Sequence, residues 1–301
     1  ADGTVGANKN SIKIIGDNTD MYAQAYFDYD SKKSGGVTMS HLRFGKKPIK
    51  STYLIHKANF VACHNPSYVN KYNMVQELVD GGTFLLNCAW DMEGLEKHLP
   101  GQVKAFIANH NIKFYTIDGV KIGIETGMGP TRLNTILQSA FFKLTGIIPE
   151  EQAIDLMKAA AKATYGRKGD DVVQKNWAAI DAGAKQVVEI QVPESWKNAE
   201  DEGLHMTHAT EGRQDVVDFV NNIQAKVNAQ EGNSLPVSAF KDYVDGTTPS
   251  GAAAYEKRGT AVNVPEWDAA KCIQCNNCAF VCSHATIRPF LLSEDEVKAA
   301  P

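Results

Sequence analysis

Four cysteines near the end of the chain have the spacing of a metal-cluster site. They are Cys272, Cys275, Cys278 and Cys282. Two residues lie between successive members of the first three, and three residues lie between the third and the fourth. This pattern is typical of a loop that wraps a cubane 4Fe–4S cluster, with the fourth cysteine usually a ligand of a second cluster. The run therefore predicts four iron ligands.

Zinc and disulfides are the alternatives for this run. Structural zinc sites normally combine Cys or His pairs that are separated by a longer spacer. Disulfides among four cysteines within eleven positions are too crowded, and no secretory context supports them. Ser283 stands where a proline usually follows the fourth cysteine, but that proline shapes a turn and binds no iron.

The ends of the chain bear on how the cluster would be completed. A two-cluster module needs a second cysteine run that lends one ligand to the first cluster. No cysteine follows Cys282 before Pro301, and the chain opens at Ala1 without an initiator methionine. We expect either a one-cluster variant or a piece of a longer polypeptide, and we favour the piece.

Two glycine-containing stretches could hold an anion. Asp2, Gly3, Thr4, Val5 and Gly6 form a turn that enters a helix, where backbone N–H groups and the helix N-terminus can bind phosphate. The loop from Lys32 to Gly36 is basic and could also grip an anion. A plain structural turn and a solvated loop are the alternatives for the two stretches.

Strand and helix patterns alternate over the first 190 or so residues. Extended patterns cover 20–30, 37–45, 53–56, 60–63, 83–89 and 113–117. Helical patterns cover 68–79, a short stretch after Asp91, 103–109, 118–126, 133–144 opened by Thr131, 150–164 and 170–188. The near-continuous apolar run 83–89 is typical of a strand buried on both faces. We predict an α/β fold with a mostly parallel sheet flanked by helices.

The character of the chain changes after about residue 190. Pro193, Trp196 and a polar run mark a boundary, one further helix is predicted over 215–229, and a Pro- and Gly-containing connector covers 232–264. We expect an α/β domain over 1–195, an irregular connecting domain over 196–264, and a partial ferredoxin-like module over 265–301.

Composition argues for an ordinary soluble globular chain. The net charge of −4 gives no reason to expect nucleic acid as a partner, and no apolar run is long enough for a membrane span. Cys63 and Cys88 lie in apolar runs and are interpreted as buried thiols in a reducing cytoplasm. His205 and His208 are interpreted as surface histidines. No Ser/His/Asp set or recognisable carboxylate pair indicates carbon chemistry by this chain alone.

Four separate motifs resemble pyruvate:ferredoxin (flavodoxin) oxidoreductases. They are the segments 2–15, 34–45 and 128–134 and the cysteine run from Cys272, in the family's order. The resemblance covers the whole chain and corresponds to the middle of the family's polypeptide: the γ-type domain, the connecting domain and the start of a two-cluster ferredoxin domain. The domains that bind thiamine diphosphate and Mg lie outside it.

The resemblance implies a function and a binding site. The family converts pyruvate and coenzyme A to acetyl-CoA and carbon dioxide and passes electrons through 4Fe–4S clusters to ferredoxin or flavodoxin, in a homodimeric parent. It implies that the Asp2–Gly6 turn receives the phosphates of coenzyme A. Further contacts are implied for Lys33 or Ser34, Asn134 and Asn176.

Two other functions remain open at this point. One is a stand-alone, non-enzymatic electron carrier or scaffold with one cluster, for which Cys282 would have to fold back as the fourth ligand. The other is a nucleotide-binding domain with a structural zinc. The sequence does not distinguish ferredoxin from flavodoxin, or pyruvate from another 2-oxoacid.

Overall fold

The computed structural model describes residues 4–30, 36–200, 203–204, 206–256 and 266–299. The chain divides into two compact units, Ala1–Arg258 and Gly259–Pro301. The three domain boundaries expected from the sequence stay predictions.

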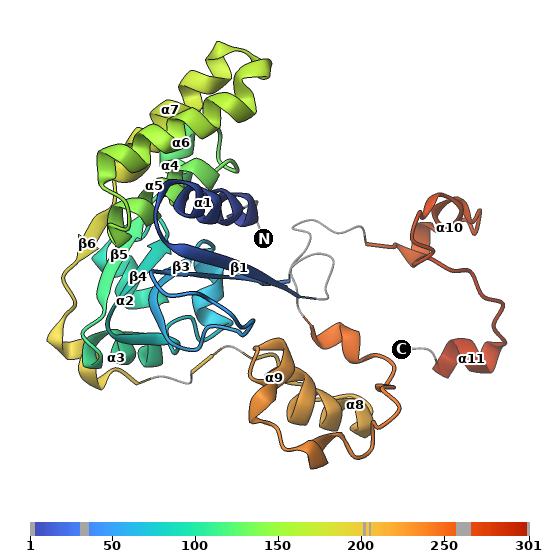
Figure 1. Ribbon diagram of the computed structural model, residues 1–301. Coiled ribbons are helices and arrows are strands. Elements are labelled where there is room, and N and C mark those ends of the chain that lie inside the picture. The colour runs from blue at the N-terminus through green and yellow to red at the C-terminus, as the bar shows by residue number, and fades with distance from the viewer. Residues whose placement is uncertain (1–3, 31–35, 201–202, 205, 257–265, 300–301) are drawn as a thin grey trace. The chain divides into compact units, whose positions relative to one another are not determined.

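A four-stranded sheet lies at the centre of the first unit (Figure 1). Its strands stand in the order β3 (Ala58–Cys63), β4 (Leu78–Asn87), β5 (Lys113–Ile117) and β6 (Val188–Ile190). The first three strands are parallel, and β6 runs antiparallel to β5. The predicted mostly parallel sheet is therefore confirmed, with one short edge strand that the sequence analysis missed.

Side chains of β4 alternate between two apolar clusters on opposite faces of the sheet. Phe84 and Leu86 pack in one cluster with residues of α2 (Met92–His98) and α3 (Gly101–Asn109). Leu85 packs in the other with residues of α4 (Gly119–Glu125), α5 (Asn134–Thr145) and α7 (Asp170–Lys185). The strand is buried on both faces, as the apolar run predicts.

Helix α7 crosses α5 at very short range. A Cβ on Gly183 would lie 2.5 Å from the backbone oxygen of Ile136, so only glycine fits there. The Ser139 hydroxyl donates a 2.6 Å hydrogen bond to the Ile180 carbonyl. A third apolar cluster joins these two helices to α1 (Thr4–Asn18) and α6 (Glu150–Tyr165).

A separate two-stranded antiparallel sheet packs on α1. It consists of β1 (Tyr22–Tyr29) and β2 (Thr38–Gly45), with Tyr26 opposite His41. Residues alternate between the two faces of a strand. The face of Phe27 turns toward α1, since the ammonium of Lys9 lies 5.4 Å from the centre of that ring. The face of Tyr22 and Tyr26 therefore turns away from α1.

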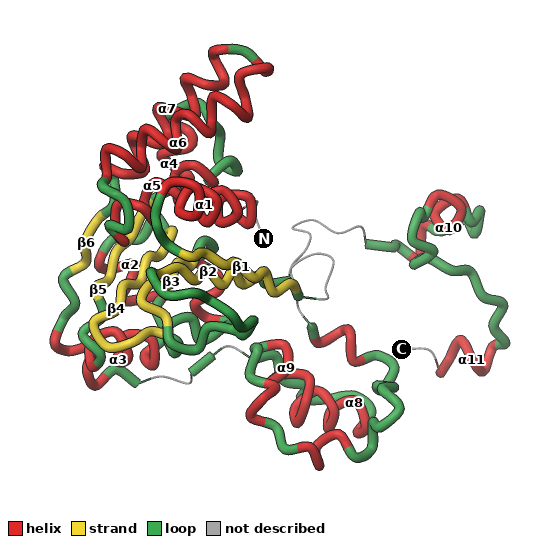
Figure 2. Tube along the Cα trace, viewed as in Figure 1, coloured by secondary structure: helices red, strands yellow, loops and turns green. Residues whose placement is uncertain are grey.

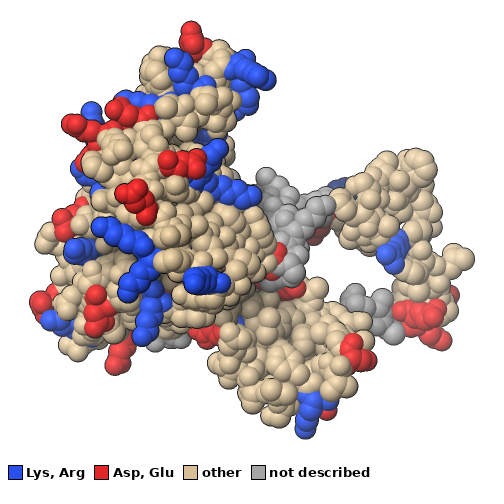
Figure 3. All heavy atoms as spheres, in the orientation of Figure 1, with Lys and Arg blue, Asp and Glu red and all other residues tan. Residues whose placement is uncertain are grey.

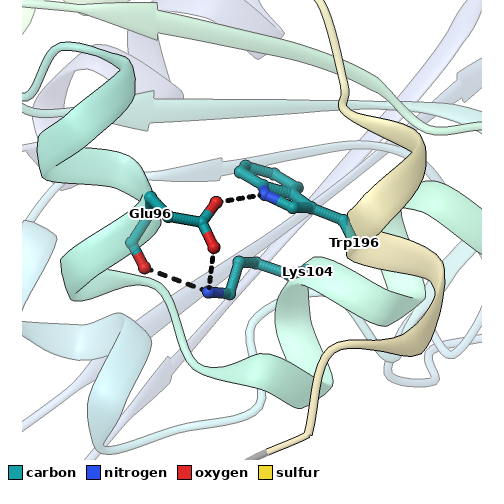
Figure 4. Close-up of polar contacts among 3 residues, drawn as sticks. All are labelled: Glu96, Lys104 and Trp196. Atoms are coloured by element: carbon teal, nitrogen blue, oxygen red, sulfur yellow. Dashed lines mark hydrogen bonds and ion pairs between the residues drawn. The ribbon is translucent and has the colours of Figure 1, made fainter.

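The segment after β6 packs on α3 and is tied to α2 by a buried tryptophan (Figure 4). Trp196 lies in the short helix η3 (Glu194–Asn198) and is 1% exposed. Its indole N–H donates to the Glu96 carboxylate, which also accepts from Lys104 Nζ at 3.1 Å. Lys104 Nζ reaches the Glu96 carbonyl as well, at 3.0 Å. These bonds fix the point from which the chain leaves the α/β layers.

Residues 206–256 form short helices and turns around a small apolar cluster of their own (Figure 2). The predicted helix over 215–229 is confirmed as α8 (Gln214–Phe219), a π-helical turn Val220–Gln224 and α9 (Ala225–Asn228). Asn221, in the π turn, donates to and accepts from the backbone of Ala209, both at 2.9 Å. The connector is thus irregular but not without a core.

The second unit buries none of its described residues 266–299. It contains α10 (Asn277–Val281) and α11 (Glu294–Ala299), and large apolar side chains such as Phe280 and Leu291 are exposed. Among the described residues of the whole chain, no helix is long and apolar enough to cross a membrane.

Three local predictions are wrong. The expected helix 68–79 is instead a short 3₁₀ helix, Pro66–Asn70, followed by a loop that leads into β4. Val69 of the 3₁₀ helix and Val75 of the loop are buried in the sheet's core, and this burial produces the helix-like spacing. Segment 53–56 is not a strand; its Ile55 N–H donates to His41 Nδ1 instead of to a sheet. Thr131 does not cap α5, whose first turn follows Leu133.

We expect Trp196→Phe to lower the free energy of unfolding by about 1–2 kcal/mol, because the Glu96 carboxylate loses its indole donor. Trp196, then Lys104, lowers the pKa of Glu96 from its ordinary 4.5. The stabilisation that the ionised Glu96 gives is therefore full above pH 4.5. It is lost as the pH falls through the lower pKa that Glu96 has in the folded chain. Urea unfolding of both proteins at pH 7 and pH 4 measures this difference.

Trp267→Phe is the matched control for this experiment. Trp267 is 70% exposed, so its replacement should leave the unfolding free energy within error of the parent's. Equal stability of the Trp196 and Trp267 variants at neutral pH would contradict the role of the Trp196–Glu96 bond.

Candidate functional site

The cysteine loop has the backbone turns that let thiols converge. Gln274 and Asn276, which flank Cys275, have φ values of 58° and 59°, in the left-handed region that tightens a loop. The Gln274 N–H donates to Cys272 Sγ at 3.4 Å, and the Thr286 N–H donates to Cys282 Sγ at 3.3 Å. Backbone donors aimed at sulfur stabilise thiolates, which are the ligands that iron–sulfur clusters require.

Backbone hydrogen bonds favour the thiolate form of Cys282. Hydrogen bonds from the backbone of Ile287, then of His284 and Thr286, lower its pKa below the ordinary value of 9.0. Its position follows α10 directly. Within the described part of the chain, no three His, Cys, Asp or Glu side chains form a metal-binding group. The donor chemistry and the loop turns therefore fit a cluster, while the thiols themselves stand apart.

Helices α1 and α5 run side by side in the same direction. A Cβ on Gly6 would lie 3.6 Å from Asn134 Nδ2, and one turn further along, Asn10 Nδ2 donates to Gln138 Oε1 at 3.3 Å. The N-terminal ends of both helices therefore meet at one end of the pair. Their backbone N–H groups and dipoles both favour an anion there.

Buried polar atoms without a partner gather at this end. They are Asn134 Oδ1 and Thr135 Oγ1 in the first turn of α5, and Gln138 Nε2 in the next turn. Such atoms are costly unless a ligand or water completes them. The sequence analysis named Asn134 but missed Thr135, Gln138 and Asn10. Thr135 and Gln138 stand out only as polar residues in an apolar helix, and the pairing of Gln138 with Asn10 depends on which helix lies opposite.

Asn176 is not brought next to Asn134. It lies in α7 and is 1% exposed, with its Nδ2 donating to the Val172 carbonyl at 2.8 Å and its Oδ1 unpartnered. The contacts of Gly183 with Ile136 and of Ser139 with Ile180 make α5 and α7 antiparallel. Asn176 is therefore displaced from the level of Asn134 by about 13 Å along the helix axis, at 1.5 Å per residue.

The remaining candidates of the anion site are only partly described. Thr4 and Val5 open α1, with Gly6 in its first turn. Asp2, Gly3, Lys33 and Ser34 lie outside the described residues.

A buried asparagine joins the loops at the carboxyl edge of the sheet. Asn87 ends β4; its Nδ2 donates to the His64 carbonyl, and its Oδ1 accepts from the Gly119 N–H, both at 2.9 Å. Burial lowers the pKa of His64 to about 4, so this imidazole is neutral at pH 7. The sequence analysis missed Asn87, because a single Asn in an apolar strand has no distinctive signal.

The two cysteines of the sheet are buried free thiols, as expected. Cys63 ends β3, and Cys88 follows β4. Burial raises the pKa of Cys63 to about 12 and that of Cys88 to about 11. Neither thiol is a nucleophile at neutral pH.

The cysteine spacing and the backbone turns of the loop after the α/β domain are those of iron–sulfur proteins. Three family models match the chain. Residues 1–186 match pyruvate ferredoxin/flavodoxin oxidoreductase, residues 206–261 match a domain of unknown function, and residues 264–287 match a 4Fe–4S binding domain. The chain belongs to the pyruvate ferredoxin/flavodoxin oxidoreductase family and carries a 4Fe–4S binding domain.

Curated relatives agree with this assignment. The chain is 54% identical over 301 residues to the pyruvate-flavodoxin oxidoreductase of Enterobacter agglomerans and 51% identical to the pyruvate:ferredoxin oxidoreductase of Moorella thermoacetica. It is also 47% identical to the pyruvate dehydrogenase [NADP(+)] of Cryptosporidium parvum. All of this chain is matched, but it spans 25% of the first two relatives and 16% of the third.

A solved structure resembles the first part of the chain. It is the crystal structure of the pyruvate oxidoreductase subunit PORC of Thermotoga maritima, with 18% sequence identity and a TM-score of 0.49. The similarity covers 64% of this chain and 93% of that one.

We expect four thiols of the cluster-free chain to react rapidly with an aromatic disulfide reagent at pH 8 and two to react slowly. Cys272, Cys275 and Cys278 are exposed and Cys282 is half-buried, whereas Cys63 and Cys88 are buried with raised pKa values. The slow pair should stay slow up to pH 9.

Denaturant should make all six thiols equally fast, which serves as the control. Cys63→Ala combined with Cys88→Ala should remove the slow phase alone. Rapid labelling of either sheet cysteine in the folded chain would contradict the burial argument.

Proposed function

We propose that the chain is the coenzyme A-receiving and electron-conducting part of an enzyme that oxidatively decarboxylates pyruvate to acetyl-CoA. One observation carries this proposal: a region of the oxidoreductase family and a 4Fe–4S binding domain follow one another in a single chain. The relatives' names supply pyruvate as the substrate and ferredoxin or flavodoxin as the electron acceptor.

Cys272, Cys275, Cys278 and Cys282 would hold the iron. The loop turns at Gln274 and Asn276 orient the first cysteines, and backbone N–H groups stabilise the sulfur of Cys272 and Cys282 as thiolates. When bound, a 4Fe–4S cluster supplies one-electron transfer. The chain's own contribution is to supply thiolates, place backbone dipoles near them and fix the loop.

The adjoining N-terminal ends of α1 and α5 would receive coenzyme A. Backbone N–H groups around Thr4 to Gly6 suit its phosphates, and Asn134 offers an unpartnered amide oxygen to a donor of the ligand. Lys33 or Ser34 would add a cation or hydroxyl. Asn176 lies far enough from Asn134 that both can contact only an extended ligand.

The chain alone would be inactive with pyruvate. Among its described residues no three His, Cys, Asp or Glu side chains form a metal-binding group. Thiamine diphosphate and Mg would belong to other domains of a homodimeric parent. We place that parent in the cytoplasm, because the cluster cysteines and two free sheet cysteines suit a reducing compartment.

Anaerobic reconstitution tests the cluster assignment. A chain that supplies all four ligands should bind about four irons and four acid-labile sulfides, with a broad thiolate-to-iron absorption. If Cys282 serves another cluster, the chain supplies only three ligands to the first one, and Cys282→Ser should leave the iron content of the parent chain, full or incomplete, unchanged. If the chain is a stand-alone one-cluster carrier, Cys282→Ser should abolish it.

Cys88→Ser is the control, because Cys88 lies in the other unit and should not affect the iron content. Zinc in place of iron, or iron that persists after Cys275→Ser, would contradict the assignment.

Calorimetric titration with coenzyme A tests the second assignment. We expect Asn134→Ala to weaken binding roughly 2- to 12-fold, the equivalent of one hydrogen bond. Raising the salt concentration should weaken binding by both proteins, because the contacts to phosphate are electrostatic.

Asn18→Ala is the matched control. Asn18 ends α1 at the opposite pole and donates to the Ile14 carbonyl. Its replacement should leave coenzyme A affinity unchanged. Equal affinity of the Asn134 variant and the parent would exclude Asn134 from the site.

A further inference from the structure

One stretch of the chain has a charge opposite to that of the whole. Residues 31–76 contain eight Lys and Arg and no Asp or Glu, although the chain has a net charge of −4. Within this stretch, Arg43 lies on β2, and Lys46, Lys47, Lys50 and Lys57 are exposed on the loop that follows. Figure 3 shows Lys and Arg side chains, with Asp and Glu among them, over the face of the first unit that it presents.

The loop lies against the outer face of the β1–β2 hairpin. The Tyr53 ring stacks on the Arg43 guanidinium at 3.8 Å, and Arg43 Nη2 donates to the Ser51 carbonyl at 3.2 Å. The Ile55 N–H donates to His41 Nδ1 at 3.1 Å. These contacts hold the lysines of the loop beside the strands. We call this surface, formed by Tyr22, Tyr26, Arg43, Tyr53 and the loop 46–57, the hairpin face.

The hairpin face combines cations with exposed aromatic rings. Tyr22, Tyr26 and Tyr53 are each more than half exposed. Tyrosine and arginine are enriched at the centres of protein interfaces, because they offer large contact areas with polar ends. Two nitrogen atoms here, Arg43 Nη1 and His41 Nε2, are buried without a partner. An acceptor on a docked surface could complete them after a small shift of the loop.

Few acidic groups oppose this charge. Asp28 lies on the same side of β1 as Tyr26, and Glu77 approaches His56 at 3.4 Å. Lys46, Lys47, Lys50 and Lys57 have no ion pair within the described residues, in contrast to Lys143 and Lys158 on the α5–α7 side, which are paired with Glu150 and Asp181. Unpaired surface cations attract an anionic partner over about 10 Å at physiological salt.

We propose that the hairpin face is the docking surface for an acidic electron-carrier protein. Charge complementarity selects an acidic partner, and the tyrosines favour a protein surface over a small anion. The identity of the partner as an electron carrier rests on the proposed function. The placement of its docking surface on the hairpin does not follow from the family.

Carbodiimide cross-linking of the whole chain to an acidic ferredoxin and to an acidic flavodoxin tests this. Cross-links should map to Lys46, Lys47, Lys50 or Lys57, and they should fade as salt rises from about 50 to 300 mM. Replacing Lys46, Lys47 and Lys50 together by Gln should weaken affinity at least about tenfold. Tyr26→Ser should weaken it about threefold without changing the salt dependence.

The matched control replaces Lys162, Lys168 and Lys185 by Gln. These lysines are exposed on α6, on α7 and between them, and the change in net charge is the same. The control should bind as the parent does. An equal loss in both triple variants, cross-links spread over the surface, or no binding of either carrier would overturn the proposal.

Coenzyme A provides the remaining arm of the experiment. Saturating coenzyme A should leave the cross-links in place. Its displacement of the carrier would show that the hairpin face belongs to the nucleotide site, and the docking proposal would fall. Iron content and coenzyme A affinity of the hairpin variants should match the parent's, so failure of docking is distinguishable from failure of the proposed function.

Discussion

Burial of β4 on both faces is the constraint on which the first unit depends. Because Phe84 and Leu86 require cover on one side and Leu85 on the other, helices must lie on both faces of the sheet. The layer of α5 and α7 then provides a surface for α1, with Gly183 permitting the close approach of the first two. Only after these layers form do the N-terminal ends of α1 and α5 meet. The proposed anion site is therefore a consequence of core packing at a distance.

The second unit, unlike the first, is not stabilised by buried apolar side chains. None of its described residues is buried, so apolar burial cannot offset the entropy of ordering the chain. In small domains of this kind, metal ligation supplies the missing free energy, and folding and metal binding become one equilibrium. The exposed Phe280 and Leu291 indicate that cluster ligation alone would still leave apolar surface to cover.

The sequence predicted what depends on local pattern. Two-sided burial of β4, the short helix that begins after Asp91 and the amphipathic helices α6 and α7 all follow from short-range spacing. It failed where tertiary packing produces a misleading pattern, as at Val69 and Val75, or where an element is too short to have one, as in β6. The polar partners Asn10, Gln138 and Asn87 were missed because their role depends on which helix or strand lies opposite.

Trp196 connects these observations, because it determines where the connector begins. A buried indole held by Glu96 stabilises the sheet edge and also fixes the direction in which the chain leaves it. Under the proposed function, an electron-conducting module must lie within a limited distance of its electron donor, so a freely pivoting exit of the chain would be costly. A side chain buried in the same core as Phe84 and Phe114 cannot be released without disturbing the sheet. The stability of the α/β layers and the starting point of the connector are in this way coupled through one residue.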